Sequence, residues 1–197
     1  MPNWCSTAYA IEGNATELKK LYELMKDLEK RQKPSVQNGF GTTWLGCLVE
    51  ALGESWEKIY CRGTWDNLKF NGEVLTFNTE TAWSPCNEMF DMVCEKYPTL
   101  RYFYQSEEPG MCEYWTNDDE GKYFPDRYYV DVCTSEEEYY SEYFQDLEAY
   151  MTGWRIFVKY KSNPVRMSMR LSSNGKKKMK THTALFTNIK YRHNRRA

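Results

Sequence analysis

Apolar residues change their spacing near the start of the chain. The segment from Trp4 to Ile11 has the composition of a strand. From Asn14 onward apolar residues return every three or four positions, which predicts an amphipathic helix. We expect the helix to begin at Asn14, which has a capping-box spacing with Glu17, and to end near Arg31. Its apolar face consists of Leu18, Leu21, Tyr22, Met25 and Leu28.

Residues 34–58 interrupt this pattern. Several glycines surround the apolar run from Trp44 to Leu52, which predicts a loop containing one short helix that Gly53 ends. The segments Lys58–Trp65 and Val74–Thr79 then predict two antiparallel strands. Between them lie the turn-forming residues Asp66, Asn67, Asn71 and Gly72.

A second helix is predicted from Ser84-Pro85, because a cap residue followed by a first-turn proline favours a helix start. Pro98 ends it, and Leu100–Gln105 predicts the next strand. The order β-α-β-β-α-β is the split βαβ arrangement of ferredoxin-like folds, within the α+β class. We expect two more strands, Cys112–Trp115 and Tyr128–Val132, to extend the same sheet. The helix presents Met89, Phe90, Val93, Cys94 and Tyr97 on one face.

The sequence predicts a boundary after residue 132. Residues 1–132 form the ferredoxin-like domain, with 34–58 as an insertion, and residues 133–197 form a C-terminal extension. The extension begins with a helix over 135–151 that has an apolar and an acidic side. A basic antiparallel β-meander over 154–191 follows, because 154–161 and 166–171 alternate with period two and 183–191 has the composition of a third strand.

One register of the first hairpin in this meander keeps its apolar residues together, and it places Lys161 opposite Arg166. The other face then combines cations with the ring of Phe157, which are the ingredients of a platform for single-stranded nucleic acid. The same face would also suit an acidic protein surface or be an ordinary solvated strand face. Its residues are Arg155, Phe157, Lys159, Lys161, Arg166 and Arg170, followed by Lys176, Lys177, Lys178 and Lys180 in the next loop.

Charge is divided unequally along the chain. Residues 154–197 contain 13 of the 26 Lys and Arg residues and no Asp or Glu, whereas residues 1–153 contain 13 basic and 28 acidic residues, a net charge of −15. Such segregation indicates two surfaces with different partners, or two surfaces that face each other. Residues 107–148 alone hold 14 acidic and 2 basic residues, a density that can imitate a nucleic-acid backbone or belong to solvated helix and loop faces.

Four short motifs carry a resemblance to a known family. They are Pro2-Asn3-Trp4-Cys5, Arg62-Gly63-Thr64-Trp65-Asp66, Thr81-Ala82-Trp83-Ser84-Pro85 and the segment from Glu107 to Met111. In this order they resemble the YubB-like ferredoxin-like family of phages, plasmids and other mobile elements. The resemblance covers roughly residues 1–132 and implies a fold and a genomic setting, whereas the family has no established activity.

The motif tryptophans predict a second candidate site at one end of the sheet. Trp4, Trp65 and Trp83 could line a pocket there with Arg62 and Asp66. Alternatively, the tryptophans could be core residues, with Arg62 and Asp66 joined in an ion pair. Cys86 is expected in the first turn of the second helix, where the helix dipole lowers a thiol pKa. A nucleophile would also need a base, and the two histidines, His182 and His193, lie in the basic segment. We therefore favour a buried structural cysteine.

The seven cysteines occur singly, an odd number without a C-x-x-C pair, which favours reduced thiols in the cytoplasm. No apolar run approaches the roughly 18 residues of a membrane span. We also expect no cofactor and no metal site.

These observations predict a non-enzymatic accessory protein of a phage or mobile element. Its partner would be a host protein or ribonucleoprotein complex, such as a restriction or CRISPR effector that it inhibits. One alternative is direct binding of single-stranded nucleic acid or RNA by the basic C-terminal sheet. Another is a small-ligand binder or thiol enzyme around Cys86 and the tryptophans.

Overall fold

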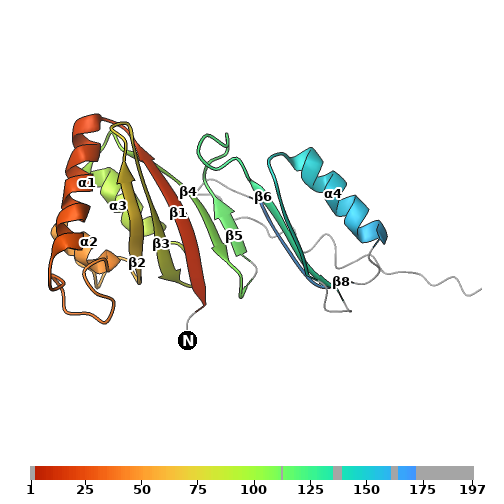
Figure 1. Cartoon of the computed structure of the whole chain (residues 1–197), viewed down its shortest axis with the longest axis horizontal. Coiled ribbons are helices and arrows are strands. Elements are labelled where there is room, and N and C mark those ends of the chain that lie inside the picture. The colour runs from red at the N-terminus through yellow and green to blue at the C-terminus, as the bar shows by residue number, and fades with distance from the viewer. Residues whose placement is uncertain (1–2, 112, 135–138, 161–163, 172–197) are drawn as a thin grey trace, which may run out of the picture.

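The computed structural model describes residues 3–111, 113–134, 139–160 and 164–171 (Figure 1). Helices and strands are mixed along the chain, so the predicted α+β class is confirmed. In chain order the elements are β1 (Trp4–Glu12), α1 (Ala15–Lys30), α2 (Leu45–Ala51), β2 (Gly63–Phe70), β3 (Val74–Ala82), α3 (Asn87–Lys96), β4 (Arg101–Glu108), β5 (Glu113–Thr116), β6 (Tyr128–Thr134), β7 (Tyr139–Phe144), α4 (Leu147–Tyr160) and β8 (Pro164–Leu171).

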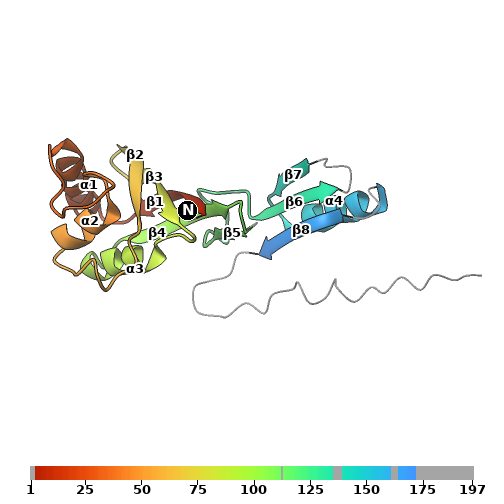
Figure 2. The same ribbon diagram turned by 90° about the horizontal axis from the view of Figure 1, so that it is seen from below.

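Five strands form an antiparallel sheet in the order β2-β3-β1-β4-β5. Helices α1, α2 and α3 pack on one face of it (Figures 1 and 2). Side chains alternate along β1, and Tyr9 and Ile11 point into the core between sheet and helices. This core contains the ring contacts of Tyr9 with Phe77 and Phe90, whose centroids lie 5.3 and 4.2 Å from that of Tyr9.

The predicted apolar face of α1 is confirmed by the burial of Leu18, Leu21, Met25 and Leu28. The Asn14 side chain caps this helix and accepts a hydrogen bond from Thr16 N at 2.8 Å. The capping-box role of Glu17 is wrong, because its carboxylate accepts hydrogen bonds from the backbone and hydroxyl of Thr99, at 3.3 and 2.6 Å. Glu17 therefore ties the start of α1 to the segment before β4.

Two boundaries differ from those predicted. The structure starts α3 at Asn87, because Ser84 N donates to Ala82 O at 2.9 Å and holds this segment in a turn. The strand predicted over Lys58–Trp65 lies at Gly63–Phe70 instead and runs through the predicted turn. It does so through a register shift between Asp66 and Lys69, where Asn67 has a φ of 52°.

The short helix predicted within 34–58 is confirmed as α2, and Gly53 with a φ of 87° follows it. The strand predicted at 112–115 joins the first sheet as β5. In contrast, Tyr128–Val132 lies in β6, which belongs to a separate three-stranded sheet of order β7-β6-β8. The expectation that this segment extends the first sheet is therefore wrong, and a boundary after residue 132 would divide β6.

The helix predicted over 135–151 is confirmed at 147–151 and wrong at 139–144, and the strand predicted over 154–161 is wrong at 154–160. Residues 139–144 form β7, and α4 continues through 154–160. Asp146 explains the start of α4, because its carboxylate accepts a hydrogen bond from Ala149 N at 2.7 Å. Buried Tyr150 then packs on Val130, Tyr128 and Phe144, which fixes α4 on the second sheet. The strand predicted at 166–171 is present as β8, whereas 183–191 lies outside the described residues.

The two sheets lie side by side, with β8 next to β5 (Figure 2). Rings from both sheets meet at this junction. Tyr114 of β5 lies 5.8 Å from Tyr129 of β6 and 6.1 Å from Tyr143 of β7, measured between ring centroids. The Tyr143 hydroxyl also donates a hydrogen bond to the Glu107 carboxylate on β4. These contacts join the second sheet to the edge of the first.

Candidate binding surface on the open sheet face

The face of the five-stranded sheet opposite the helices is called here the open face. Strand pairing arranges its side chains in rows across the sheet, because neighbouring strands place paired residues on the same face. From one end to the other, the rows are Ala82 and Trp4; Thr64, Glu80, Ser6, Glu107 and Tyr114; Asp66, Asn78, Ala8, Gln105 and Thr116; Lys69, Thr76, Ala10 and Phe103; and Val74, Glu12 and Arg101.

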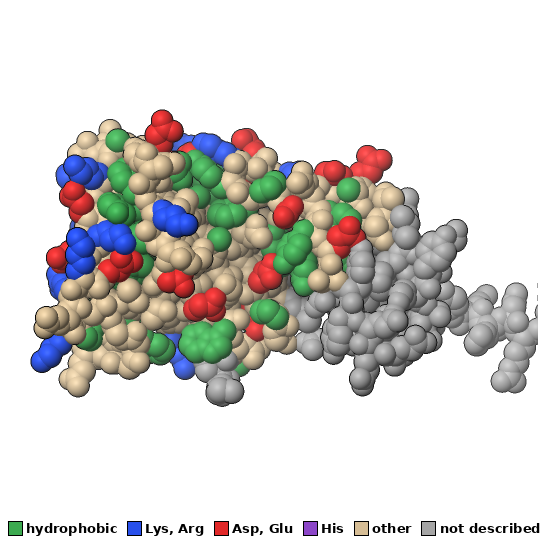
Figure 3. Space-filling model, viewed as in Figure 1, with side chains coloured by type: hydrophobic (Ala, Val, Ile, Leu, Met, Phe, Trp, Pro, Cys, Tyr) green, Lys and Arg blue, Asp and Glu red, His purple; other side chains and the backbone are tan. Residues whose placement is uncertain are grey.

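Three large apolar side chains are exposed at the first end of this face. Trp4, Trp83 and Met111 have exposed fractions of 46%, 44% and 42%, and we call them the tryptophan patch. Trp4 pairs with Ala82, and Trp83 N donates to Asn3 O at 2.8 Å, so the two tryptophans lie on adjoining backbone. Figure 3 shows hydrophobic and acidic side chains exposed together along the lower edge of the molecule, below β1 and β3 of Figure 1.

Trp83 has a φ of 71°, a left-handed conformation that is rare for bulky residues. Its neighbours hold it there. Besides the bond from Trp83 N, the Thr81 hydroxyl donates to Ser84 O at 2.8 Å, and Ala82 N donates to Arg62 O at 2.9 Å. Strained backbone that surrounding hydrogen bonds enforce is concentrated at functional sites in proteins. The structure therefore maintains an exposed indole at an energetic cost.

Part of the predicted tryptophan pocket is brought together. Trp4, Arg62 and Trp83 reach the same end of the sheet, and Arg62 is exposed. Trp65 is not part of this end, because its side chain is 1% exposed in the core and its indole N–H donates to Glu29 at 3.2 Å. Asp66 is exposed on the open face, and no ion pair joins it to Arg62 in the part of the chain that the structure describes.

Cys86 lies beneath this end as the cap residue of α3, not in its first turn, and its side chain is fully buried. Burial raises the pKa of the Cys86 thiol far above its ordinary value, and the neighbouring Cys61 and Cys5 raise it further. The thiol is therefore protonated at neutral pH and shielded from reagents, as expected for a structural cysteine. Nearby, the Ser106 hydroxyl lies 2.9 Å from Cys5 Sγ and 2.7 Å from the Thr7 hydroxyl, which completes a buried polar network.

At the other end, residues 117–127 cross the open face, and we call them the strap. Asp118 is almost fully buried, and its carboxylate accepts hydrogen bonds from the backbone N–H groups of Lys122, Tyr123 and Phe124, at 2.9, 2.7 and 2.8 Å. Asn117 fastens the strap to β4 through hydrogen bonds with the backbones of Tyr102 and Tyr104. The strap is therefore held by its own polar residues.

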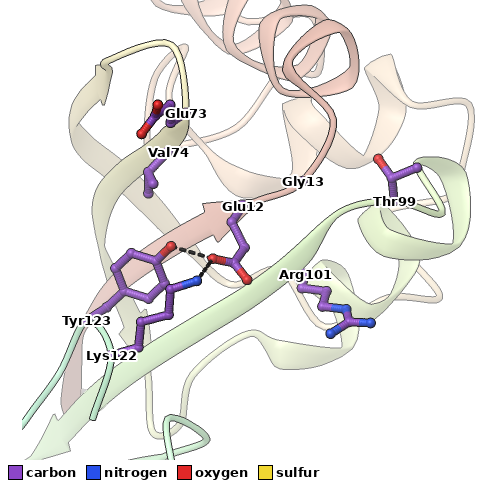
Figure 4. A pocket seen from close by; sticks show the side chains of 8 residues that line it. All are labelled: Glu12, Gly13, Glu73, Val74, Thr99, Arg101, Lys122 and Tyr123. Carbon is purple, nitrogen blue, oxygen red and sulfur yellow. Dashed lines mark hydrogen bonds and ion pairs between the residues drawn. The ribbon is translucent and has the colours of Figure 1, made fainter. Parts of the chain in front are cut away.

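Glu12 anchors the strap to β1 and lines a cavity of about 530 Å³ (Figure 4). Its carboxylate accepts hydrogen bonds from the Lys122 ammonium and the Tyr123 hydroxyl. The bonds from Lys122 and Tyr123 lower the pKa of Glu12 from its ordinary value. Arg101, Glu73 and Thr99 also line this cavity, so its walls carry both signs of charge. Sequence reasoning missed the strap, although Asn117 and Asp118 are typical side-chain-to-backbone bonding residues.

The hairpin that was predicted to carry the basic platform is not present, because 154–160 is helical. Arg155, Phe157 and Lys159 lie on helix α4, whereas Arg166 and Arg170 lie on β8, so they do not share one strand face. The register of β8 is with β6, where Arg166 pairs with Cys133 and Arg170 with Tyr129. Strand β8 of the basic segment thus pairs with β6, which lies in the acidic part of the chain. Lys161, Lys176, Lys177, Lys178 and Lys180 lie outside the described residues.

Three comparisons with known proteins, against family models, curated proteins and solved structures, each found no match. The resemblance of residues 1–132 to the YubB-like family therefore stays a prediction. Among the described residues, no group of three or more His, Cys, Asp and Glu side chains is placed to hold a metal ion. No helix in the same part of the chain is long and apolar enough to cross a membrane.

Proposed function

We propose that this protein is a non-enzymatic binding protein that docks on a macromolecular partner through the tryptophan patch. The observation that carries the proposal is Trp83, which is 44% exposed while its backbone is held in a strained left-handed conformation beside exposed Trp4. Tryptophan and arginine are enriched among the residues that dominate binding energy, and methionine is enriched in interfaces. Trp4, Trp83, Met111 and the adjoining Arg62 have this composition.

The charges beside the patch favour a basic partner. Glu80 and Glu107 flank Ser6 in the row next to Trp4, and Glu80 is exposed. Residues 1–153 together carry a net charge of −15, so the surrounding field is negative. An apolar centre with an acidic rim is complementary to a positively charged protein surface. Proteins that handle nucleic acid have such surfaces, so the proposed partner is a host protein or ribonucleoprotein complex, for example a restriction or CRISPR effector.

The proposal extends to fold and origin. The antiparallel order β2-β3-β1-β4 is the strand order expected of the split βαβ arrangement, which supports a ferredoxin-like fold with β5 added at one edge. That fold accords with the resemblance to the YubB-like family and so with an accessory role on a phage or mobile element. Cys5, Cys47, Cys61, Cys86 and Cys94 are free thiols, which supports action in a reducing cytoplasm.

The test compares proteins captured from host lysate by the full chain and by two variants. Trp4→Ser removes one indole of the patch, and Phe40→Ser is the control, because Phe40 is 44% exposed and lies in the 34–58 insertion. We expect a nucleic-acid-handling complex to bind the wild type and Phe40→Ser, and to be lost with Trp4→Ser. Circular dichroism verifies that both variants fold. Capture that is equal for all three proteins, or a partner with an acidic surface, would contradict the proposal.

A further inference from the structure

A second cavity of about 340 Å³ lies on the open face between the strap and strands β2 and β3. It adjoins the cavity of Figure 4, and Tyr123 lines both. We call it the strap groove. Its volume is within the range of about 300–1,000 Å³ typical of small-ligand sites. Its residues are distinct from those of the tryptophan patch, so a ligand of this groove is independent of the proposed function.

Two alanines of the central strand lie at the base of the strap groove. Ala8 and Ala10 follow each other on the open face of β1, and Ala8 is partly exposed there, whereas Ala10 is only 1% exposed and is already covered. The strap forms the opposite wall with Tyr123 and Phe124. The Tyr123 ring packs on Phe103 of β4, with centroids 5.1 Å apart. The slot that the groove leaves open therefore lies over Ala8, beside the aromatic side chains of the strap.

The slot is preformed because its wall is fixed at several points. Asp118 holds the backbone N–H groups of residues 122–124, and Glu12 holds the side chains of Lys122 and Tyr123. A ligand that enters the slot need not order the strap, so little conformational entropy is lost on binding. Planar aromatic rings suit such a slot, because they stack on aromatic side chains and contact methyl groups at their faces.

Two amides line the groove beside this slot. Asn78 projects from β3, and Asn67 lies at the register shift of β2, where its φ is 52°. Neither side-chain amide has a hydrogen-bond partner among the residues that the structure describes. A carboxamide offers a donor and an acceptor together, and this combination recognises the edge of a nucleobase.

Both signs of charge occur along the strap groove and the cavity beside it. Lys69 lines the strap groove itself, and Arg101 lines the adjoining cavity. Acidic groups are present as well: Glu73 lines the adjoining cavity, and Asp66 pairs with Asn78. The Glu12 carboxylate already accepts hydrogen bonds from Lys122 and Tyr123, so it is partly neutralised. Among the residues that line the strap groove, Lys69 is the cation that would hold a ligand phosphate, and it would do so against the negative field of residues 1–153.

We propose that the strap groove binds a nucleobase. The base lies over Ala8 against the strap aromatics Tyr123 and Phe124, Asn67 and Asn78 bond its edge, and its phosphate faces Lys69. The same chemistry could come from a free nucleotide or from one residue of a single-stranded nucleic acid. The two sources differ in length, so binding measurements can separate them.

The experiment titrates the full chain with the four ribonucleoside monophosphates and with single-stranded oligonucleotides of about ten residues, using calorimetry. Two variants address the groove: Ala8→Leu fills the slot, and Asn78→Ala removes one amide. Ser6→Leu is the matched control, because Ser6 precedes Ala8 on the same face of β1 but does not line the groove. Circular dichroism and thermal melting confirm that each variant is folded.

We expect Asn78→Ala to weaken binding roughly 5- to 150-fold, the range for loss of one bidentate base contact. Ala8→Leu should abolish binding, and Ser6→Leu should bind like the wild type. Binding of monophosphates identifies a nucleotide site, whereas binding of oligonucleotides alone identifies a strand site. No binding at millimolar ligand, or binding that the folded groove variants leave unchanged, would overturn the proposal.

Discussion

The strain at Trp83 predicts a reversal in the usual ranking of alanine and glycine. Both Trp83→Ala and Trp83→Gly remove the indole, so the folded state gives up nearly the same side-chain interactions in each variant. The two variants differ in backbone preference. A residue with a Cβ atom in the left-handed region costs about 1–2 kcal/mol, which glycine avoids. Glycine in turn loses about 0.5–1 kcal/mol more conformational free energy on folding.

The difference predicts that Trp83→Gly is more stable than Trp83→Ala by roughly 0.5–1 kcal/mol. In a domain of this size that is a shift of about 1–4 °C in Tm. Trp4 is the matched control, because it has a similar exposed fraction but lies in the regular pairing of β1 with β3. There the order should be the ordinary one, with Trp4→Gly less stable than Trp4→Ala by about 0.5–1 kcal/mol.

The assay is urea unfolding followed by circular dichroism on all four variants, with thermal melts as a second measure. The decisive quantity is whether the glycine or the alanine variant has the larger free energy of unfolding at each position. This comparison does not depend on how much the indole itself contributes to stability, because both variants lack it. If alanine is the more stable replacement at both positions, the left-handed backbone of Trp83 is not strained as argued, and the main support for the tryptophan patch is lost.

Three other predictions concern the strap and the buried thiol. Asp118→Ala should destabilise the protein by about 3 kcal/mol and expose residues 117–127 to proteolysis, because three backbone N–H groups lose a charged acceptor. Glu120→Ala is the control: Glu120 is exposed, so the unfolding free energy should change by less than about 0.5 kcal/mol. The lowered pKa of Glu12 contributes stability that is present above its ordinary value of 4.5 and is lost as pH falls through the folded-state pKa. Glu12→Gln should therefore flatten the pH dependence of urea unfolding below about pH 5, and an unchanged slope would exclude this contribution. Cys86 should resist iodoacetamide in mildly alkaline buffer and react after unfolding, as detected by peptide mass spectrometry; rapid labelling of the folded protein would contradict its burial.

The periodicity of apolar residues was sufficient for much of the first sheet. Strand β1, helix α1 and strand β4 were predictable because each buries one face against a common core, which imposes a period of two or of 3.6. Cap and turn residues were weaker signals. The Glu17 carboxylate accepts a hydrogen bond from the Thr99 hydroxyl instead of capping its own helix. Asn67 continues strand β2 where a turn was expected. In both cases a tertiary hydrogen bond or strand pairing outweighed a local preference.

Beyond residue 133 the local pattern was ambiguous. The segment 154–160 is apolar at adjacent as well as alternate positions, so its period does not distinguish a strand from a buried helix. The structure resolves this through Asp146, which caps α4, and through Tyr150, which packs on Val130. Tyrosine-rich 139–144 then pairs with β6. These are contacts between segments, and no single segment contains the information to predict them.

The sequence by itself determined the α+β class, the unequal division of charge and the set of motif tryptophans. Tertiary structure decided which tryptophans are available: Trp65 is in the core, whereas Trp4 and Trp83 are exposed at one sheet end. It also placed the strap over the open face, where residues about 110 positions apart, Glu12 and Lys122, bond each other. The physical reason is that periodicity reports only whether a side chain is buried, while a site depends on which distant backbones the sheet brings together.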